Sequence, residues 1–124
     1  MEKIYYNKLC RDKIPEIIKG KGFDCDVRTV EHEEYKREIV RKVYEEASGI
    51  GEHMDHETML KELADLYITL EAFKREFSIA DDEVGAAMQR SYDEKGGYDA
   101  RLYLGWSSDT DYVKNGRGNR GFDD

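Results

Sequence analysis

Cysteine, proline and long apolar runs are scarce in this sequence. Its 124 residues include two cysteines and one proline. Cys10 and Cys25 can form at most one disulfide and lack the spacing of a zinc site, so we expect reduced thiols. No stretch approaches the roughly 20 apolar residues of a membrane span, and residues 1–6 contain Glu2 and Lys3 rather than the apolar run of a signal peptide. These absences favour a cytoplasmic protein with no membrane partner.

Positive charge is also in deficit. The 20 Lys and Arg residues are outnumbered by 28 Asp and Glu residues, which gives a formal net charge of −8. The phosphate backbone of nucleic acid repels such a chain overall, so nucleic acid is a disfavoured partner. Charged and apolar residues each make up 39% of the chain, a balance that is typical of amphipathic helices. We therefore expect one helical domain, since the length suits a single core.

Apolar residues in the middle of the chain recur in steps of three and four, which is the period of an α-helix. In residues 31–47 the recurring positions include Tyr35, Ile39 and Val43. In residues 55–77 they form a seam that needs another helix against it. This seam consists of Met59, Leu63, Leu66, Leu70, Phe73 and Phe77. The expected helices span residues 11–19, 31–47, 55–77 and a segment from 79 or 81 to 94.

Particular residue types mark the ends of these segments. Asp12 is the expected N-cap of the first helix, with Pro15 in its first turn. Gly49 and Gly51 are expected to relieve the backbone where the second helix ends. Residues 23–30 alternate apolar and polar side chains, which fits either one short strand or an extended connector.

Together these segments predict an all-α fold: a bundle of three long helices and a short N-terminal helix, in a domain of residues 1–106. The apolar stripes are numerous for so small a chain, so we expect some of them to be buried in a homodimer or a dimer of dimers. Residues 107–124 are rich in glycine and have no helical period, which predicts a mobile tail.

Several carboxylates occupy positions where a charge needs a partner. Glu46 follows Ile39 by seven residues and therefore shares the apolar stripe of its helix. Glu62 and Asp65 are three residues apart and project from one face of the next helix. If the two helices are antiparallel neighbours, these groups and Glu45 converge, and a divalent ion such as Mg²⁺ would offset their mutual repulsion. A solvated acidic face explains the same spacing, so both interpretations stay open at this point.

Other residues allow rival interpretations. His53 and His56 lie near the acidic pair and are potential zinc ligands, although no cysteine accompanies them. The tail carries basic residues among glycines, as do segments that bind single-stranded RNA, but two aspartates follow them. These basic residues are Lys114, Arg117 and Arg120. Aromatic residues that could stack on a nucleobase, or else pack in a core or interface, are Tyr5, Tyr6, Tyr92, Tyr98 and Trp106.

Three segments resemble one protein family in sequence and in order. Glu45-Glu46, followed after fifteen residues by the ELAD of residues 62–65, resembles the EE…ExxD motif of the MazG-type all-α nucleoside triphosphate pyrophosphohydrolases. Residues 6–15 (YNKLCRDKIP) look like the start of the phosphoribosyl-ATP pyrophosphohydrolase-like branch of that family. The KGGY of residues 95–98, followed by Arg101 and Leu104, is similar to its ending. The resemblance covers roughly residues 5–104.

The resemblance implies an obligately dimeric enzyme that binds Mg²⁺ at the acidic cluster and cleaves a nucleotide between its α and β phosphates. Mn²⁺ is a second ion that would suit these ligands. The family usually continues as EExxE, with the last glutamate among the metal ligands, and Gly49 stands at that position here. Glu45, Glu52 or a water molecule would replace the missing ligand, or activity is impaired. The alternative is therefore a nucleotide-binding or protein-interaction module of the same fold.

The resemblance also implies roles for individual residues. Glu46, Glu62 and Asp65 would hold the metal, and Glu45 would orient the attacking water. Basic residues of the resembling segments would neutralise the phosphates, and these are Arg11, Lys13, Lys95 and Arg101. The catalytic candidates are Glu45, Glu46 and Lys95. The nucleotide itself stays open, because a deoxynucleotide, a damaged nucleotide, phosphoribosyl-ATP and an alarmone all present a polyphosphate.

Overall fold

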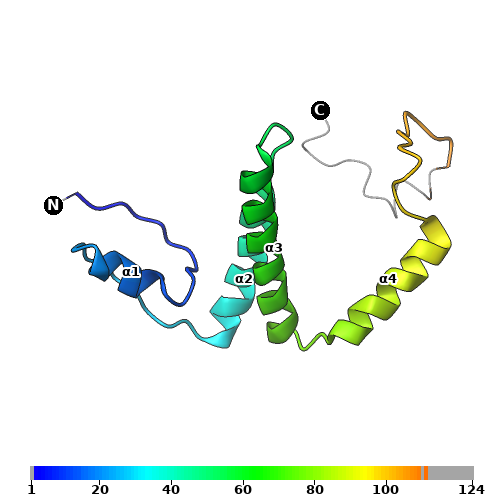
Figure 1. The fold of residues 1–124 in the computed structure, drawn as a ribbon. Coiled ribbons are helices and arrows are strands. Elements are labelled where there is room, and N and C mark those ends of the chain that lie inside the picture. The colour runs from blue at the N-terminus through cyan, green and yellow to red at the C-terminus, as the bar shows by residue number, and fades with distance from the viewer. Residues whose placement is uncertain (1, 110, 112–124) are drawn as a thin grey trace. The chain divides into compact units, whose positions relative to one another are not determined.

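The computed structural model describes residues 2–109 and 111, and these residues form four α-helices. The helices are α1 (Ile14–Gly20), α2 (His32–Ser48), α3 (His56–Glu76) and α4 (Asp81–Lys95), as Figure 1 shows. The described residues contain no strand, so residues 23–30 are a connector without regular secondary structure. The prediction of an all-α chain is confirmed for the described part, with three long helices and a short one before them. Most of the predicted tail, residues 107–124, lies outside the described residues.

The observed helix ends follow from local chemistry, with one correction. The N-cap position of α1 is held by Lys13, whose side chain makes no capping bond, so the prediction of Asp12 as N-cap is wrong. Pro15 instead defines the first turn, where its missing N–H costs nothing. At α3 the cap is formed, since the Asp55 carboxylate accepts a hydrogen bond of 2.8 Å from the backbone N–H of Thr58. This cap fixes where α3 begins.

The chain divides into two compact units between Gly85 and Ala86, a point inside α4. In the first unit α2 and α3 pack side by side and run in opposite directions, joined by a short turn (Figure 1). Ile39 of α2, at 4% exposure, is the one apolar side chain of the described residues that is buried. Thr69 of α3 is also buried, and its hydroxyl donates a bond of 2.9 Å to the Asp65 carbonyl of the preceding turn.

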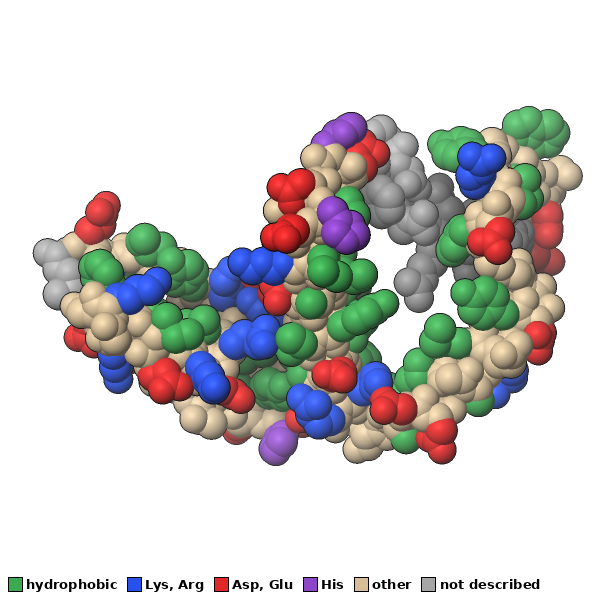
Figure 2. Space-filling view, in the orientation of Figure 1, with side chains coloured by type: hydrophobic (Ala, Val, Ile, Leu, Met, Phe, Trp, Pro, Cys, Tyr) green, Lys and Arg blue, Asp and Glu red, His purple; other side chains and the backbone are tan. Residues whose placement is uncertain are grey.

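Much of the apolar surface of the first unit is uncovered. Figure 2 shows hydrophobic side chains gathered on the surface over α3. The exposed apolar side chains of α3 include Leu60, Leu63 and Tyr67, which succeed one another in steps of three and four and are 58%, 38% and 61% exposed. Leu66 and Thr69, which are less exposed, lie on another flank of α3. None of the helices that the structure describes has the length and hydropathy to cross a bilayer.

Candidate metal centre

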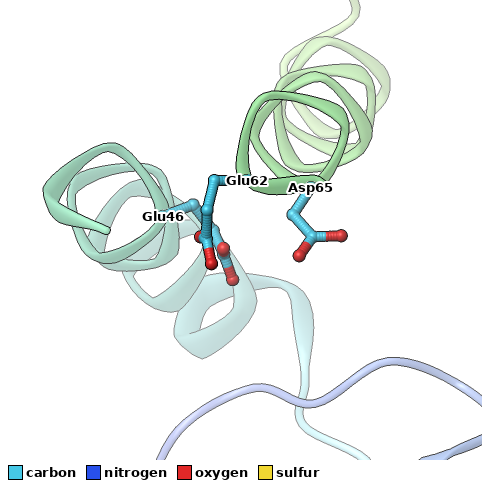
Figure 3. Close-up of side chains that lie close together, drawn as sticks. All are labelled: Glu46, Glu62 and Asp65. Carbon is cyan, nitrogen blue, oxygen red and sulfur yellow. The ribbon is translucent and has the colours of Figure 1, made fainter. Parts of the chain in front are cut away.

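Three carboxylates meet between the two long helices of the first unit. Glu46 projects from the last turns of α2, and Glu62 and Asp65 project from the second and third turns of α3 (Figure 3). One oxygen from each residue lies within 4.8 Å of an oxygen of the other two. All three side chains are half-buried. The candidate ligands from the sequence are therefore brought together by the fold.

The convergence has a local cause in each helix. Glu46 is seven residues after the buried Ile39, two helical turns along the stripe that faces α3. Glu62 lies seven residues, or two helical turns, after the N-cap residue Asp55. The helical turn that follows Asp65 is held by the buried Thr69, whose hydroxyl bonds to the Asp65 carbonyl. Because α2 and α3 run in opposite directions, the end of the first lies beside the beginning of the second. The Glu46 side chain consequently meets the two carboxylates of α3.

Glu45 lies next to this cluster and is held by two lysines. Its Oε1 accepts a hydrogen bond of 2.8 Å from Lys42 and one of 3.1 Å from Lys8. The bond from Lys42 lowers the pKa of the Glu45 carboxyl below its ordinary value, and Lys8 adds to this effect, while partial burial acts in the opposite direction. Glu45 is therefore an anion at neutral pH.

Two further ion pairs join cations to the cluster itself. Arg11 Nη1 lies 3.7 Å from Asp65 Oδ1, and Lys42 Nζ lies 3.6 Å from Glu46 Oε1. Lys8 and Lys42 were not among the residues selected from the sequence. Lys42 could have been found, because it precedes Glu46 by four residues on one helix face. The only sequence feature that could have pointed to Lys8 is its position in the segment of residues 6–15, which resembles the MazG-type family.

Gly49 lies against the carboxylate cluster. It occupies the C-cap of α2 with φ of −76°, a conformation open to any residue, so backbone relief does not explain this glycine. A Cβ added here would lie 2.9 Å from Glu62 Oε2 and 3.4 Å from the Glu46 carbonyl. A side chain at position 49 would therefore point at the cluster.

The remaining basic candidates lie elsewhere. Lys13 is the N-cap residue of α1 and makes no ion pair with another described residue. Lys95 and Arg101 belong to the second unit. There, Lys95 lines a cavity of about 370 Å³ together with Tyr92 and Tyr98. The structure therefore brings Arg11, but not Lys13, to the acidic cluster within the first unit.

The histidines of the connecting loop do not form a metal site with the described residues. His53 is exposed and its Nε2 lies 3.4 Å from Glu52 Oε1. His56 is the first residue of α3. Neither belongs to a group of three potential ligands in the part of the chain that the structure describes. The zinc interpretation therefore receives no support from this geometry.

The carboxylate cluster fits a small divalent ion. Mg²⁺ binds oxygen at about 2.1 Å in an octahedron, so its ligand oxygens are about 3.0 Å apart as neighbours and about 4.2 Å apart on opposite sides. The oxygens of the cluster lie within 4.8 Å of one another, so side-chain movements of roughly 1 Å would bring them onto one ion. Carboxylate oxygens are also the donors that Mg²⁺ and Mn²⁺ prefer.

Comparison with models of known protein families, with curated proteins and with solved structures finds no match for this chain. The class of protein is therefore defined by geometry alone. It is an all-α chain in which two antiparallel helices present three carboxylates to one point, with basic side chains beside them.

Proposed function

We propose that this chain is a Mg²⁺-dependent nucleotide pyrophosphohydrolase that cleaves between the α and β phosphates. The observation that carries the proposal is the convergence of Glu46, Glu62 and Asp65 from two helices. These are the positions that the resemblance to the MazG-type enzymes selects as metal ligands. Carboxylates on a solvated acidic face repel one another and have no reason to converge on one point.

The reaction needs a polarised phosphate, a positioned water and a stabilised leaving group. Mg²⁺ held by Glu46, Glu62 and Asp65 would polarise the phosphate oxygens. The water oxygen would bond to the α-phosphorus as the bond from that phosphorus to the α–β bridging oxygen breaks. Pyrophosphate would leave with the bridging oxygen, and the proton of the water would pass to solvent. Glu45 has a lowered pKa and is a weak base, so its role is to orient the water by accepting a hydrogen bond.

Basic residues complete the proposed site by binding the phosphates. Arg11 already lies at the cluster, with its side chain 56% exposed and accessible to a ligand. Lys13, the N-cap residue of α1, makes no ion pair with the described residues of the cluster and is a second cation that the resemblance selects. The resemblance also selects Lys95, which we count among the catalytic groups, and Arg101 for binding phosphates. Their charges would stabilise the pyrophosphate as it departs.

We further propose that the functional form is a homodimer or a dimer of dimers. The support is the exposed stripe of Leu60, Leu63 and Tyr67, together with a core in which Ile39 is the one buried apolar side chain of the described residues. In a two-fold dimer the same surface of both subunits forms the interface, so the apolar stripe of one copy can pack against the same stripe of a second copy.

An assay of product identity tests the proposed reaction. The protein is incubated with Mg²⁺ and a panel of nucleoside triphosphates, deoxynucleotides and phosphoribosyl-ATP, and products are separated by anion-exchange chromatography. We expect nucleoside monophosphate and pyrophosphate in equal amounts from at least one substrate, and none with EDTA. Release of single phosphates would contradict cleavage at the α–β bond. No turnover, together with a melting shift on adding nucleotide, would favour the binding module.

Gly49 provides a second test, because a carboxylate there would restore the missing fourth ligand. We expect Gly49→Glu to raise the affinity for Mn²⁺ about tenfold, measured by electron paramagnetic resonance. Without metal the same variant should melt at a lower temperature than wild type, since it adds a negative charge beside Glu62.

Gly49→Gln is the matched control, since it adds the same bulk without the charge. We expect it to show neither the gain in Mn²⁺ affinity nor the extra loss of stability in EDTA. Equal Mn²⁺ affinities for the two variants would show that position 49 does not reach the ion.

A further inference from the structure

The N-terminal segment brings two cations to the acidic cluster from outside the helix pair. Residues 2–13 have no regular secondary structure, and their ribbon passes below the carboxylates in Figure 3, in the blue of the chain's start. Lys8 pairs with Glu45 at 3.1 Å and Arg11 pairs with Asp65 at 3.7 Å. The two carboxylates belong to different helices, so the segment bridges α2 and α3.

Backbone geometry fixes the course of the segment on both sides of these residues. Asn7 has φ of 49°, in the left-handed region that asparagine tolerates better than most residues, and this bend precedes Lys8. The carbonyl of Arg11 accepts a bond of 3.0 Å from the N–H of Ile14, which ties it to the first turn of α1. Between them, Leu9 is half-buried.

The charges at this place are nearly balanced without a ligand. Four carboxylates (Glu45, Glu46, Glu62 and Asp65) face three cations (Lys8, Arg11 and Lys42). A divalent ion at the cluster would reverse the sign of the local charge. Arg11 would then be repelled from Asp65, and the site as a whole would attract a polyphosphate.

The ion pairs of Lys8 and Arg11 are also weak enough for each cation to exchange its carboxylate for another anion. The side chains of Lys8 and Glu45 are 39% and 37% exposed, and those of Arg11 and Asp65 are 56% and 36% exposed. Ion pairs of this exposure contribute little, so a phosphate group with three oxygens can replace the carboxylate as partner. Lys42, by contrast, is 15% exposed and lies on α2 itself, so it stays with Glu45 and Glu46.

We propose that Lys8 and Arg11 form a phosphate clamp that pairs with the acidic cluster until a divalent ion binds, and then transfers to the polyphosphate of the nucleotide. This inference rests on the proposed metal site and adds an order of binding to it. The metal binds first, because it displaces the clamp from the carboxylates. The ligand of the clamp is the pyrophosphate half of the nucleotide, whatever base is attached.

Opposite changes in two affinities test the clamp. Mn²⁺ binding is measured by electron paramagnetic resonance, and pyrophosphate binding by calorimetry at saturating Mn²⁺. We expect Arg11→Ala to bind Mn²⁺ roughly two- to fivefold more tightly, because Asp65 loses its competing partner. The same variant should bind pyrophosphate at least about tenfold more weakly, because a charge-assisted contact is lost. Lys8→Ala should change both affinities in the same directions.

Two control variants separate the clamp from other roles of the segment. Lys3→Ala removes an exposed cation of the same segment that has no ion pair among the described residues, and should leave both affinities unchanged. Arg11→Lys keeps the charge and should retain most of the pyrophosphate affinity. Circular dichroism checks that each variant keeps its helices.

The outcomes distinguish the clamp from the proposed function. If wild type binds no Mn²⁺, the metal site and the proposed enzyme fail together with the clamp. If wild type binds Mn²⁺ but Arg11→Ala leaves both affinities unchanged, the clamp alone is overturned. Weaker binding of both ligands by Arg11→Ala would also overturn it, because that result assigns the segment a purely structural role.

Discussion

Glu62→Gln or Asp65→Asn is expected to lower pyrophosphate release at least about a hundredfold while the protein stays folded. Each change removes one charged ligand from the cluster and keeps the size of the side chain. The fold should survive because both residues are only half-buried and neither is an apolar core residue. The measurement is the rate of pyrophosphate release at saturating Mg²⁺, with far-ultraviolet circular dichroism as the test of folding.

Glu71→Gln is the matched control for these two variants. Glu71 is an exposed residue of the same helix, α3, and makes no ion pair with another described residue. We expect its rate to stay within about twofold of wild type, as for surface changes away from a site. If Glu62→Gln and Asp65→Asn retained the rate of wild type, the carboxylate cluster would not be the catalytic metal site.

Tyr67→Asp is expected to dissociate the dimer and to lower the melting temperature by roughly 10 °C or more. Tyr67 is 61% exposed in the single chain and lies in the stripe with Leu60 and Leu63. An unpaired carboxylate there would have to be desolvated in an interface, which is strongly unfavourable. Sedimentation equilibrium should give wild type a mass of at least twice that of the 14.5 kDa chain, and the variant a lower mass.

Lys61→Asp is the control for the interface. Lys61 is exposed and lies on a different flank of α3 from Tyr67, because successive residues of a helix are about 100° apart. We expect this variant to remain a dimer. A monomeric wild type at micromolar concentration, with an unchanged melting temperature for Tyr67→Asp, would contradict the proposed dimer.

The helices themselves were largely predictable because they depend on local patterns. The three- and four-residue steps of α2 and α3 place both helices within about one residue of their observed ends. The start of α1 was predicted too early, since the Asp12 side chain does not cap it. Residues 23–30 could not be assigned from alternation, because a strand depends on a partner elsewhere in the chain.

The candidate site was predictable only where its members share a helix. Glu62 and Asp65 lie on one face through spacing alone, and the antiparallel turn that adds Glu46 was a hypothesis that the structure bears out geometrically. Gly49 was interpreted from the sequence as backbone relief at a helix end. The structure instead shows an ordinary φ of −76° and the Glu62 carboxylate where a side chain would stand.

The sequence by itself determined the all-α class and the shared face of Glu62 and Asp65, because each depends on residues within a few turns of one another. Only the tertiary structure decided which cations from outside α2 and α3 reach the cluster. Lys8 meets Glu45 across 37 residues, from an irregular segment with no period to read. Contacts of this kind depend on how the chain turns between its helices, and no local pattern encodes that path.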